Sequence, residues 1–276
     1  MEPIKSELLA LLRRDDLLRA ALLVGSVQDA NFDIERYVER VLEIAARAWQ
    51  RARQAPDDPV LVARSVSETL AVDVGLARGE RVKHIIDDPE RHYLHRLLER
   101  RVGSPVAVAI LFACVAKHLK LKFQVIALPS QYLVRIDDAV GPFYVDPFDD
   151  GKVFSEEDVQ RKLRSSMQRG KLLSTSIYEV AGAKQLVGRQ LTQLKQSYLL
   201  KNKALEALRT VELLTAIYPN SPELTRDRGI LYCEMEYFTH AVRDLKNYLK
   251  ARPDASDVQE VKKLASMLKD CQEIVN

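Results

Sequence analysis

Apolar residues recur at helical spacing through most of the first hundred positions. Residues 4–24 show this spacing, and residues 32–55 show it over a longer stretch, so both segments are predicted to be helical. One face of the longer segment is predicted to hold an apolar series: Ile34, Val38, Val41, Leu42, Ala45, Ala48 and Trp49. Further helices are expected over residues 60–72 and 88–98. The first hundred residues are therefore predicted to be all-helical.

The pattern changes at Gly103-Ser104-Pro105, which is typical of a helix start. Serine is a favoured N-cap, and proline fits the first helical position because its missing N–H costs nothing there. Residues 106–119 are apolar nearly all round, which predicts a buried helix. Three short β-branched or aromatic runs follow, at residues 123–128, 132–136 and 142–146. We expect three antiparallel strands against the buried helix, and then a helix over 152–168.

An internal repeat begins after about residue 186, and its period is 34 residues. The matching pairs are Tyr198 with Tyr232, Ala207 with Ala241, and Pro219 with Pro253. This period is the length of a tetratricopeptide repeat, in which paired helices stack into an array. Gly229 fills the small position of the second unit, whereas Lys195 stands there in the first, so the first unit is degenerate. Residues 256–275 are predicted to form the capping helix that such arrays need.

The composition sets limits on the class of protein. Of 276 residues, 47% are hydrophobic and 29% charged, with a formal net charge of +3, so neither a nucleic-acid nor a membrane-surface partner is indicated. No apolar run is long enough to span a bilayer, and the first residues lack a secretory pattern. Three cysteines without C-x-x-C spacing favour a reducing compartment. We therefore expect a cytoplasmic protein with no cofactor and no metal site.

Several single residues invite a chemical interpretation. Cys114 lies within the apolar helix and is expected to be a core residue rather than a thiolate. His92 and His95 could bind metal from one helix face, but no third ligand follows, so a partly exposed pair is favoured. The segment 96–101 carries three arginines and one glutamate. A solvated helix face is the expected role for it, with an acidic partner as the alternative.

Four segments together resemble the bacterial transglutaminase-like plus tetratricopeptide-repeat proteins of the invasion-regulator SirB family. They are residues 93–101, 103–105, 129–134 and 144–148, and the most specific part of the likeness runs from 94 to 151.

The resemblance implies an α+β fold that is mostly helical. A papain/transglutaminase-like core with a small antiparallel sheet would occupy residues 1–185. A two-repeat tetratricopeptide helical array with its capping helix would occupy residues 186–276.

The wider superfamily, as the resemblance implies, uses a Cys at a helix N-terminus, a His on one strand and an Asp on the next. The Cys position falls here at Ser104 or Pro105, the His position at Gln131 and the Asp position at Asp146. The SirB-type pattern usually lacks the Cys but commonly keeps the His. A Gln cannot act as a general base near pH 7, and a Ser without a base stays protonated. Acyl transfer is therefore not expected, and the polar remnants are expected to hydrogen-bond one another.

The repeats offer the other functional surface. Repeat geometry predicts a concave, partner-binding face built from Thr192, Gln196, Leu199, Leu200, Arg226, Ile230, Cys233 and Glu234. The alternative is that so short an array packs flat on the first domain.

The favoured hypothesis is a non-catalytic cytoplasmic regulator or scaffold that binds a protein or peptide of unknown identity. One alternative is a hydrolase or acyltransferase of the cysteine-protease-like superfamily that uses Ser104 with His92 or His95 as base. Another is a structural subunit of a homo-oligomer.

Overall fold

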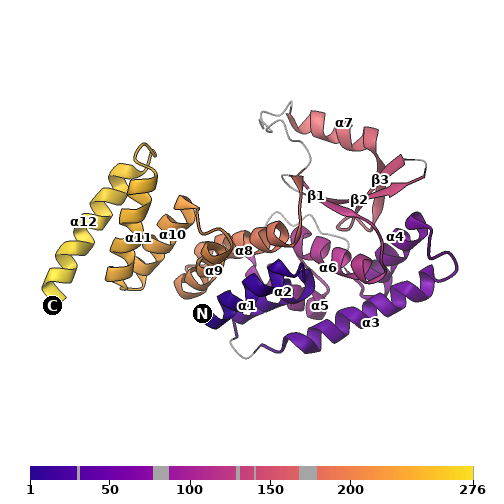
Figure 1. Cartoon of the computed structure of the whole chain (residues 1–276), viewed down its shortest axis with the longest axis horizontal. Coiled ribbons are helices and arrows are strands. Elements are labelled where there is room, and N and C mark those ends of the chain that lie inside the picture. Colours follow the sequence, from indigo (N-terminus) through magenta and orange to yellow (C-terminus); the bar gives the residue numbers. More distant parts are fainter. Residues whose placement is uncertain (30–31, 77–86, 129–130, 140, 168–178, 276) are drawn as a thin grey trace. The chain divides into compact units, whose positions relative to one another are not determined.

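A computed structural model describes residues 1–29, 32–76, 87–128, 131–139, 141–167 and 179–275 (Figure 1). The helices are α1 (Glu2–Arg13), α2 (Leu17–Leu23), α3 (Ile34–Ala52), α4 (Pro59–Glu68), α5 (Leu94–Arg100), α6 (Pro105–His118), α7 (Glu156–Met167), α8 (Ala183–Leu200), α9 (Ala204–Ile217), α10 (Pro222–Glu234), α11 (Phe238–Ala251) and α12 (Val258–Val275). Short helical turns are η1 (Val24–Val27), η2 (Thr69–Asp73) and η4 (Pro89–His92). The strands are β1 (Gln124–Ala127), β2 (Tyr132–Asp138), β3 (Gly141–Asp146), β4 (Lys152–Ser155) and β5 (Glu179–Val180).

Aspartate caps set several of the helix starts. Asp16, Asp33 and Asp58 each accept a hydrogen bond from a backbone N–H in the first turn of α2, α3 and α4. The predicted helix over 4–24 is broken between α1 and α2, where Asp15 has a positive φ of 54°. Helix α5 ends at Arg101, which adopts the left-handed conformation with φ 61°.

The sheet is antiparallel throughout, in the order β4-β3-β2-β1-β5. The three strands expected from the sequence are its central members, β1, β2 and β3. On one face, Tyr144, Phe154 and Leu133 form an apolar cluster with Val159 of α7. On the other, Val134 and Val145 are register partners and are buried on the side that α6 covers. Figure 1 shows α6 and α7 on opposite sides of the strands.

The segment from residue 152 corrects one expectation. Helix was predicted from residue 152, but Lys152–Ser155 is strand β4, and the helix begins only at Glu156. Phe154 pairs with Tyr144 of β3 and is buried, whereas the neighbouring Val153 is 59% exposed. A four-residue strand is too short to show a period of two in the sequence, and only its pairing partner makes it a strand. Residue 168 lies outside the described part.

Helix α3 corrects a second expectation. Its buried residues are Tyr37, Val38, Val41, Ile44, Ala45, Ala48 and Ala52. Leu42 and Trp49, which the sequence placed on the same face, are 40% and 44% exposed. Both lie at the margin of the apolar stripe, roughly a quarter-turn from its centre at 3.6 residues per turn, so the core does not reach them.

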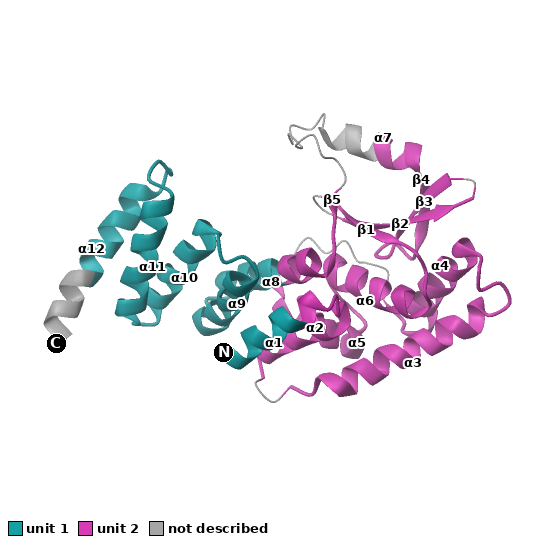
Figure 2. Cartoon of the chain, in the orientation of Figure 1, with its two compact units in different colours: residues 1–10, 191–276 teal, residues 11–190 magenta. Residues whose placement is uncertain are grey.

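The chain divides into two compact units (Figure 2). One comprises residues 11–190, and the other comprises residues 1–10 together with 191–276. The division falls within α8, five residues beyond the boundary expected after residue 185. The first ten residues group with the repeats: Lys5 of α1 lies 3.6 Å from the carboxylate of Glu212 on α9.

The repeat unit follows the predicted helix pairs. Helices α8 and α9 form the first pair, α10 and α11 the second, and α12 is the predicted C-terminal helix. Ala207 and Ala241 are fully buried. A Cβ on Gly229 would lie 2.9 Å from Leu245 of α11, so a small residue is needed where these helices cross. Pro219 and Pro253 follow the ends of α9 and α11, as the spacing predicts.

Candidate functional site

Ser104 is the N-cap residue of α6, but its side chain does not cap the helix. The residue is fully buried, and its hydroxyl has no hydrogen-bond partner in the described part of the chain. Its backbone N–H donates to the carbonyl of Arg91 at 2.7 Å, which ties the start of α6 to η4. Pro105 occupies the first helical position, as expected. The helix start was therefore predicted correctly, but the role given to the serine hydroxyl was wrong.

Gln131 and Asp146 do meet, at the ends of two neighbouring strands. The Gln131 side-chain amide donates to a carboxylate oxygen of Asp146 at 3.4 Å, which is long for a hydrogen bond. The other carboxylate oxygen accepts from the backbone N–H of Phe148 at 2.9 Å and shapes the turn after β3. Asp146 is only 7% exposed. The preceding residues, Pro129 and Ser130, lie outside the described part.

Of the three residues expected to form a polar cluster, Gln131 and Asp146 are in contact, and the Ser104 hydroxyl is not bonded to either of them. Side chains alternate along a strand, so Asp146 shares the sheet face of Tyr144, which packs against α7. Helix α6, which begins after Ser104, covers the opposite face. This arrangement explains why the serine hydroxyl is not part of the Gln131–Asp146 contact. The pair holds β2 and the turn after β3 together. Gln131 has no group that can accept a proton near neutral pH, and the Ser104 hydroxyl forms no hydrogen bond to the Asp146 carboxylate.

The two histidines proposed as alternative bases are both buried. His92 is 1% exposed and His95 is 4% exposed, so the expectation of a partly exposed pair was wrong. His95 sits among the rings of Phe32, Tyr37 and Tyr93, with centroid distances of 4.6, 5.6 and 5.2 Å. Burial lowers the pKa of His95 to about 4, and the guanidinium of Arg96 acts in the same direction. Such a weak base is poorly matched to deprotonating a serine at pH 7.

Cys114 is 9% exposed within α6, and burial raises the pKa of its thiol to about 12, which identifies it as a core residue. Cys233 of α10 is half-buried and forms no disulfide among the described residues, and the side chain of Cys271 lies outside the described part. No group of three or more His, Cys, Asp or Glu side chains suited to a metal ion occurs among the described residues.

Two arginines of the cationic segment 96–101 form ion pairs with nearby glutamates. Arg96 forms ion pairs with Glu90 at 2.7 Å and with Glu99 at 2.8 Å, and Arg100 lies 3.5 Å from Glu90. The two arginine side chains are one-third to one-half exposed, so the segment is a solvated, internally paired surface.

A hollow of about 720 Å³ lies away from the triad positions. It is bordered by residues of α2, α6, β1 and the start of α8, including Cys114 and Leu17. An ion pair of 2.6 Å between Asp15 and Lys117 stands in its wall. Ser104, Gln131 and Asp146 do not line it, so this hollow is not built around the remnant polar pair.

The residues predicted to bind a partner fall into two groups. On α8, Thr192, Gln196, Leu199 and Leu200 are all exposed and follow one another at helical spacing. Leu199 and Leu200 are 43% and 60% exposed. Binding at this face is not demonstrated by exposure and stays a prediction.

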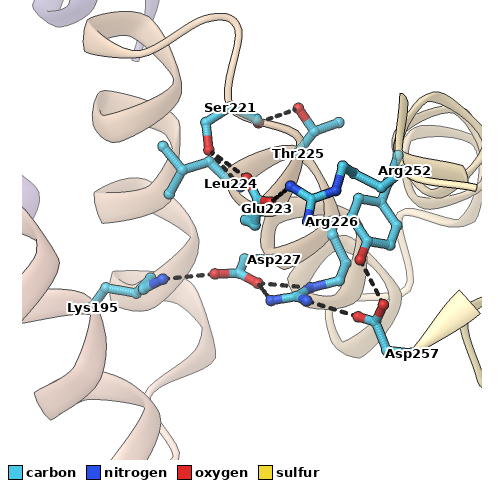
Figure 3. A network of polar contacts seen from close by, with 10 residues as sticks. Lys195, Ser221, Glu223, Leu224, Thr225, Arg226, Asp227, Arg252 and Asp257 are labelled. Carbon is cyan, nitrogen blue, oxygen red and sulfur yellow. Dashed lines mark hydrogen bonds and ion pairs between the residues drawn. The ribbon is translucent and has the colours of Figure 1, made fainter. Parts of the chain in front are cut away.

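On α10 the predicted residues are largely engaged within the unit. Ile230 and Cys233 pack against the apolar cluster formed by α11 and α12, and only Glu234 is exposed. Arg226 donates to Asp227 at 2.8 Å and to Asp257 at 2.7 Å (Figure 3). Its guanidinium also lies 5.5 Å from the ring centre of Tyr248. These contacts come from α10 itself, from α11, and from α12 with the residue before it.

A network of charged side chains links three helices of the repeat unit, and sequence reasoning did not find it. Lys195 of α8 pairs with Asp227 of α10 at 2.6 Å, and the chain of contacts continues through Arg226 to Asp257 (Figure 3). The hydroxyl of Tyr248 on α11 donates to Asp257 and lowers the pKa of that carboxyl. The signal in the sequence was a lysine at a position where the next repeat has glycine.

Two family matches agree with this architecture. Residues 35–192 match the family described as the transglutaminase-like superfamily, and residues 194–266 match the tetratricopeptide repeat. The first match covers more than half of the 276 residues, so the chain belongs to the transglutaminase-like superfamily. The predicted fold class is confirmed: a mostly helical transglutaminase-like domain with a small antiparallel sheet, followed by tetratricopeptide repeats.

Curated bacterial proteins share part of the sequence. A UPF0162 protein of Xylella fastidiosa is 28% identical over 178 residues, which is 63% of each chain. Protein SirB1 of Salmonella typhimurium is 26% identical over 163 residues, and UPF0162 protein YchA of Escherichia coli is 28% identical over 163 residues. Each of the latter two matches covers 59% of this chain and 60% of the relative. The resemblance to SirB-type proteins is confirmed, although the chain spans less than two thirds of these relatives' length.

Proposed function

We propose that this chain is a non-catalytic member of the superfamily and acts as a regulatory or scaffolding module through protein contacts. The observation that carries the proposal is the state of Ser104. Its hydroxyl is fully buried and has no hydrogen-bond partner in the described structure, so no base is in place to activate it. A cytoplasmic location, expected from the sequence, is part of the same proposal.

The residues at the former triad positions support the proposal that the chain is non-catalytic. Gln131 stands where an imidazole would be needed, and its amide donates to Asp146 rather than exchanging protons with a nucleophile. His95, one of the two histidines considered as a base, is a weak base because of its burial. No specific contact among the described residues favours the alternative of a serine-based hydrolase or acyltransferase.

An activity test addresses directly whether the chain is non-catalytic. The purified full chain is treated with a serine-directed fluorophosphonate probe and assayed with a panel of amide and ester substrates, beside a Ser104→Ala variant. We expect no labelling at Ser104 and identical background turnover in both proteins. Turnover that disappears in Ser104→Ala, or covalent labelling of Ser104 found by mass spectrometry, would overturn the proposal.

The exposed residues of α8 support the proposal that the chain acts through protein contacts. Leu199 and Leu200 expose apolar surface beside the polar Thr192 and Gln196, a mixture that suits a helix or peptide partner. The test is affinity capture from a lysate with the full chain and with a Leu199→Ser, Leu200→Ser double variant. Met267→Ser is the matched control, because Met267 is 56% exposed on α12 of the same unit. A partner that survives Met267→Ser but is lost with the double variant is the expected result. A partner retained by all three proteins would place the contact elsewhere.

A further inference from the structure

Helix α3 carries an exposed apolar stripe that borders its buried face. Leu42, Ala46 and Trp49 follow one another at i, i+4 and i+7, so they lie in one line along the helix. All three are exposed, and Leu42 and Trp49 are 40% and 44% exposed. Trp49 is the only tryptophan in the chain. Two large apolar side chains in one line, rather than scattered singly, indicate a contact surface.

A hollow of about 370 Å³ lies beside this stripe. Its walls are Ala45, Ala46 and Trp49 of α3, together with His118, Leu119 and Lys120 at the end of α6. The apolar stripe therefore has a recess beside Trp49. An apolar side chain from a docked helix would fill it and cover the indole.

The charges at the two ends of the stripe are opposite. Glu39 precedes Leu42 by one turn and Arg53 follows Trp49 by one turn, so both continue the same line. Both are exposed, and neither forms an ion pair within the described part of the chain. The surface therefore runs from an acid, through leucine, alanine and tryptophan, to a base.

We infer that this stripe docks against the same stripe of a second copy of the chain, with the two α3 helices antiparallel about a two-fold axis at Ala45–Ala46. The midpoint of Leu42 and Trp49 and the midpoint of Glu39 and Arg53 both fall at these alanines. An antiparallel pair therefore sets Leu42 against the second copy's Trp49, and Glu39 against the second copy's Arg53. Self-complementarity of this kind is what a two-fold contact requires, and the small, exposed Ala46 at the crossing allows close helix approach, whereas Ala45 faces the core.

The small extent of this surface limits the affinity that we expect for the dimer. From residue 39 to residue 53 the helix is about 21 Å long at 1.5 Å per residue, which gives a contact at the small end of specific interfaces. The dimer should therefore be weak and visible only as concentration rises. This inference is independent of the proposed partner face on α8.

The first test measures self-association of the full chain by sedimentation velocity over a concentration series. Trp49→Ala should weaken self-association at least about tenfold, because it removes the largest apolar side chain of the contact. Val60→Ala is the matched control, since Val60 is 43% exposed on α4 of the same unit. Far-UV circular dichroism establishes that each variant is folded. A chain that stays monomeric throughout, or a dimer insensitive to Trp49→Ala, overturns the inference.

A charge-swap experiment then tests the antiparallel arrangement. Glu39→Lys and Arg53→Glu should each weaken self-association, because each places like charges opposite one another twice per dimer. An equimolar mixture of the two variants should associate again. In the mixed dimer the introduced lysine faces the introduced glutamate, and the native Arg53 of one copy faces the native Glu39 of the other. The single tryptophan provides a second readout, because its emission should shift to the blue as the dimer forms. A mixture that remains monomeric excludes the proposed pairing.

Discussion

The ammonium of Lys195 lies 2.6 Å from a carboxylate oxygen of Asp227 and joins the first helices of the two repeats (Figure 3). Lys195 occupies the repeat position that Gly229 occupies 34 residues later. The two side chains are 15% and 19% exposed. The irregular residue of the first repeat therefore takes part in the contact between the two repeats. At equivalent positions, the first repeat has a charged side chain and the second has a glycine.

Removal of Asp227 should cost more than removal of Lys195. Asp227 also accepts from Arg226, so Asp227→Ala leaves two partly buried cations without their shared partner. We expect Asp227→Ala to lower the free energy of unfolding by about 2–3 kcal/mol and Lys195→Ala by about 1 kcal/mol. Urea unfolding followed by far-UV circular dichroism measures both. The control is Arg64→Ala, which breaks an exposed pair with Glu68 and should cost under about 0.5 kcal/mol.

Two serines that precede helix-starting prolines should respond differently to alanine. The Ser221 hydroxyl accepts from the backbone N–H of Leu224 at 3.3 Å, whereas the Ser104 hydroxyl has no partner in the described structure. Ser221→Ala should destabilise the protein by about 1 kcal/mol through loss of the cap. Ser104→Ala should be neutral or stabilising by up to about 1 kcal/mol, because a buried unsatisfied hydroxyl is removed. Thermal unfolding of both variants measures these changes in stability. Equal losses of stability in the two variants would contradict the unsatisfied hydroxyl at Ser104.

The burial of His95 should make stability depend on pH between about 6.5 and 4. The folded-state pKa of about 4 lies below the ordinary value, so the folded protein holds His95 neutral. As pH falls, the unfolded chain is protonated first, and stability is lost until the folded histidine is protonated as well.

The matched variant for this effect is His95→Phe, which keeps a ring among Phe32, Tyr37 and Tyr93. From pH 7 to pH 5 the wild-type protein should lose about 1–2 kcal/mol more than the variant. Urea unfolding at both pH values gives this difference. Equal losses in the two proteins would show that His95 titrates normally in the folded state.

The turn after Asp146 should not tolerate a side chain at residue 151. Gly151 has a positive φ of 71°, and a Cβ there would lie 2.2 Å from the side chain of Ser67. Gly151→Ala should destabilise by about 2–4 kcal/mol through backbone strain and overlap. Adding Ser67→Gly removes the overlap but not the strain, so the double variant should recover part of the loss. A double variant no more stable than Gly151→Ala would show that overlap is not the cause.

None of the helices in the described ranges combines the length and apolar character needed to cross a bilayer. This agrees with the hydropathy pattern of the sequence, in which the longest apolar stretch is the buried helix α6.

The sequence alone determined the elements whose signals are local. Helix α6, the three central strands and the 34-residue repeat were predicted because apolar period, capping residues and spacing are properties of short stretches. The absence of an imidazole at residue 131 was equally visible in the sequence. These features depend on residue type and order, and the tertiary structure leaves them unchanged.

Only the tertiary structure decided which side chains meet. It placed Leu42 and Trp49 outside the core, made a strand of Lys152–Ser155, buried His92 and His95, and left the Ser104 hydroxyl without a hydrogen bond to Gln131 or Asp146. It also joined Lys195 to Asp227. Burial and pairing depend on neighbours distant in sequence. The physical reason is that a side chain's surroundings are set by packing between elements, whereas a periodic pattern specifies only the element itself.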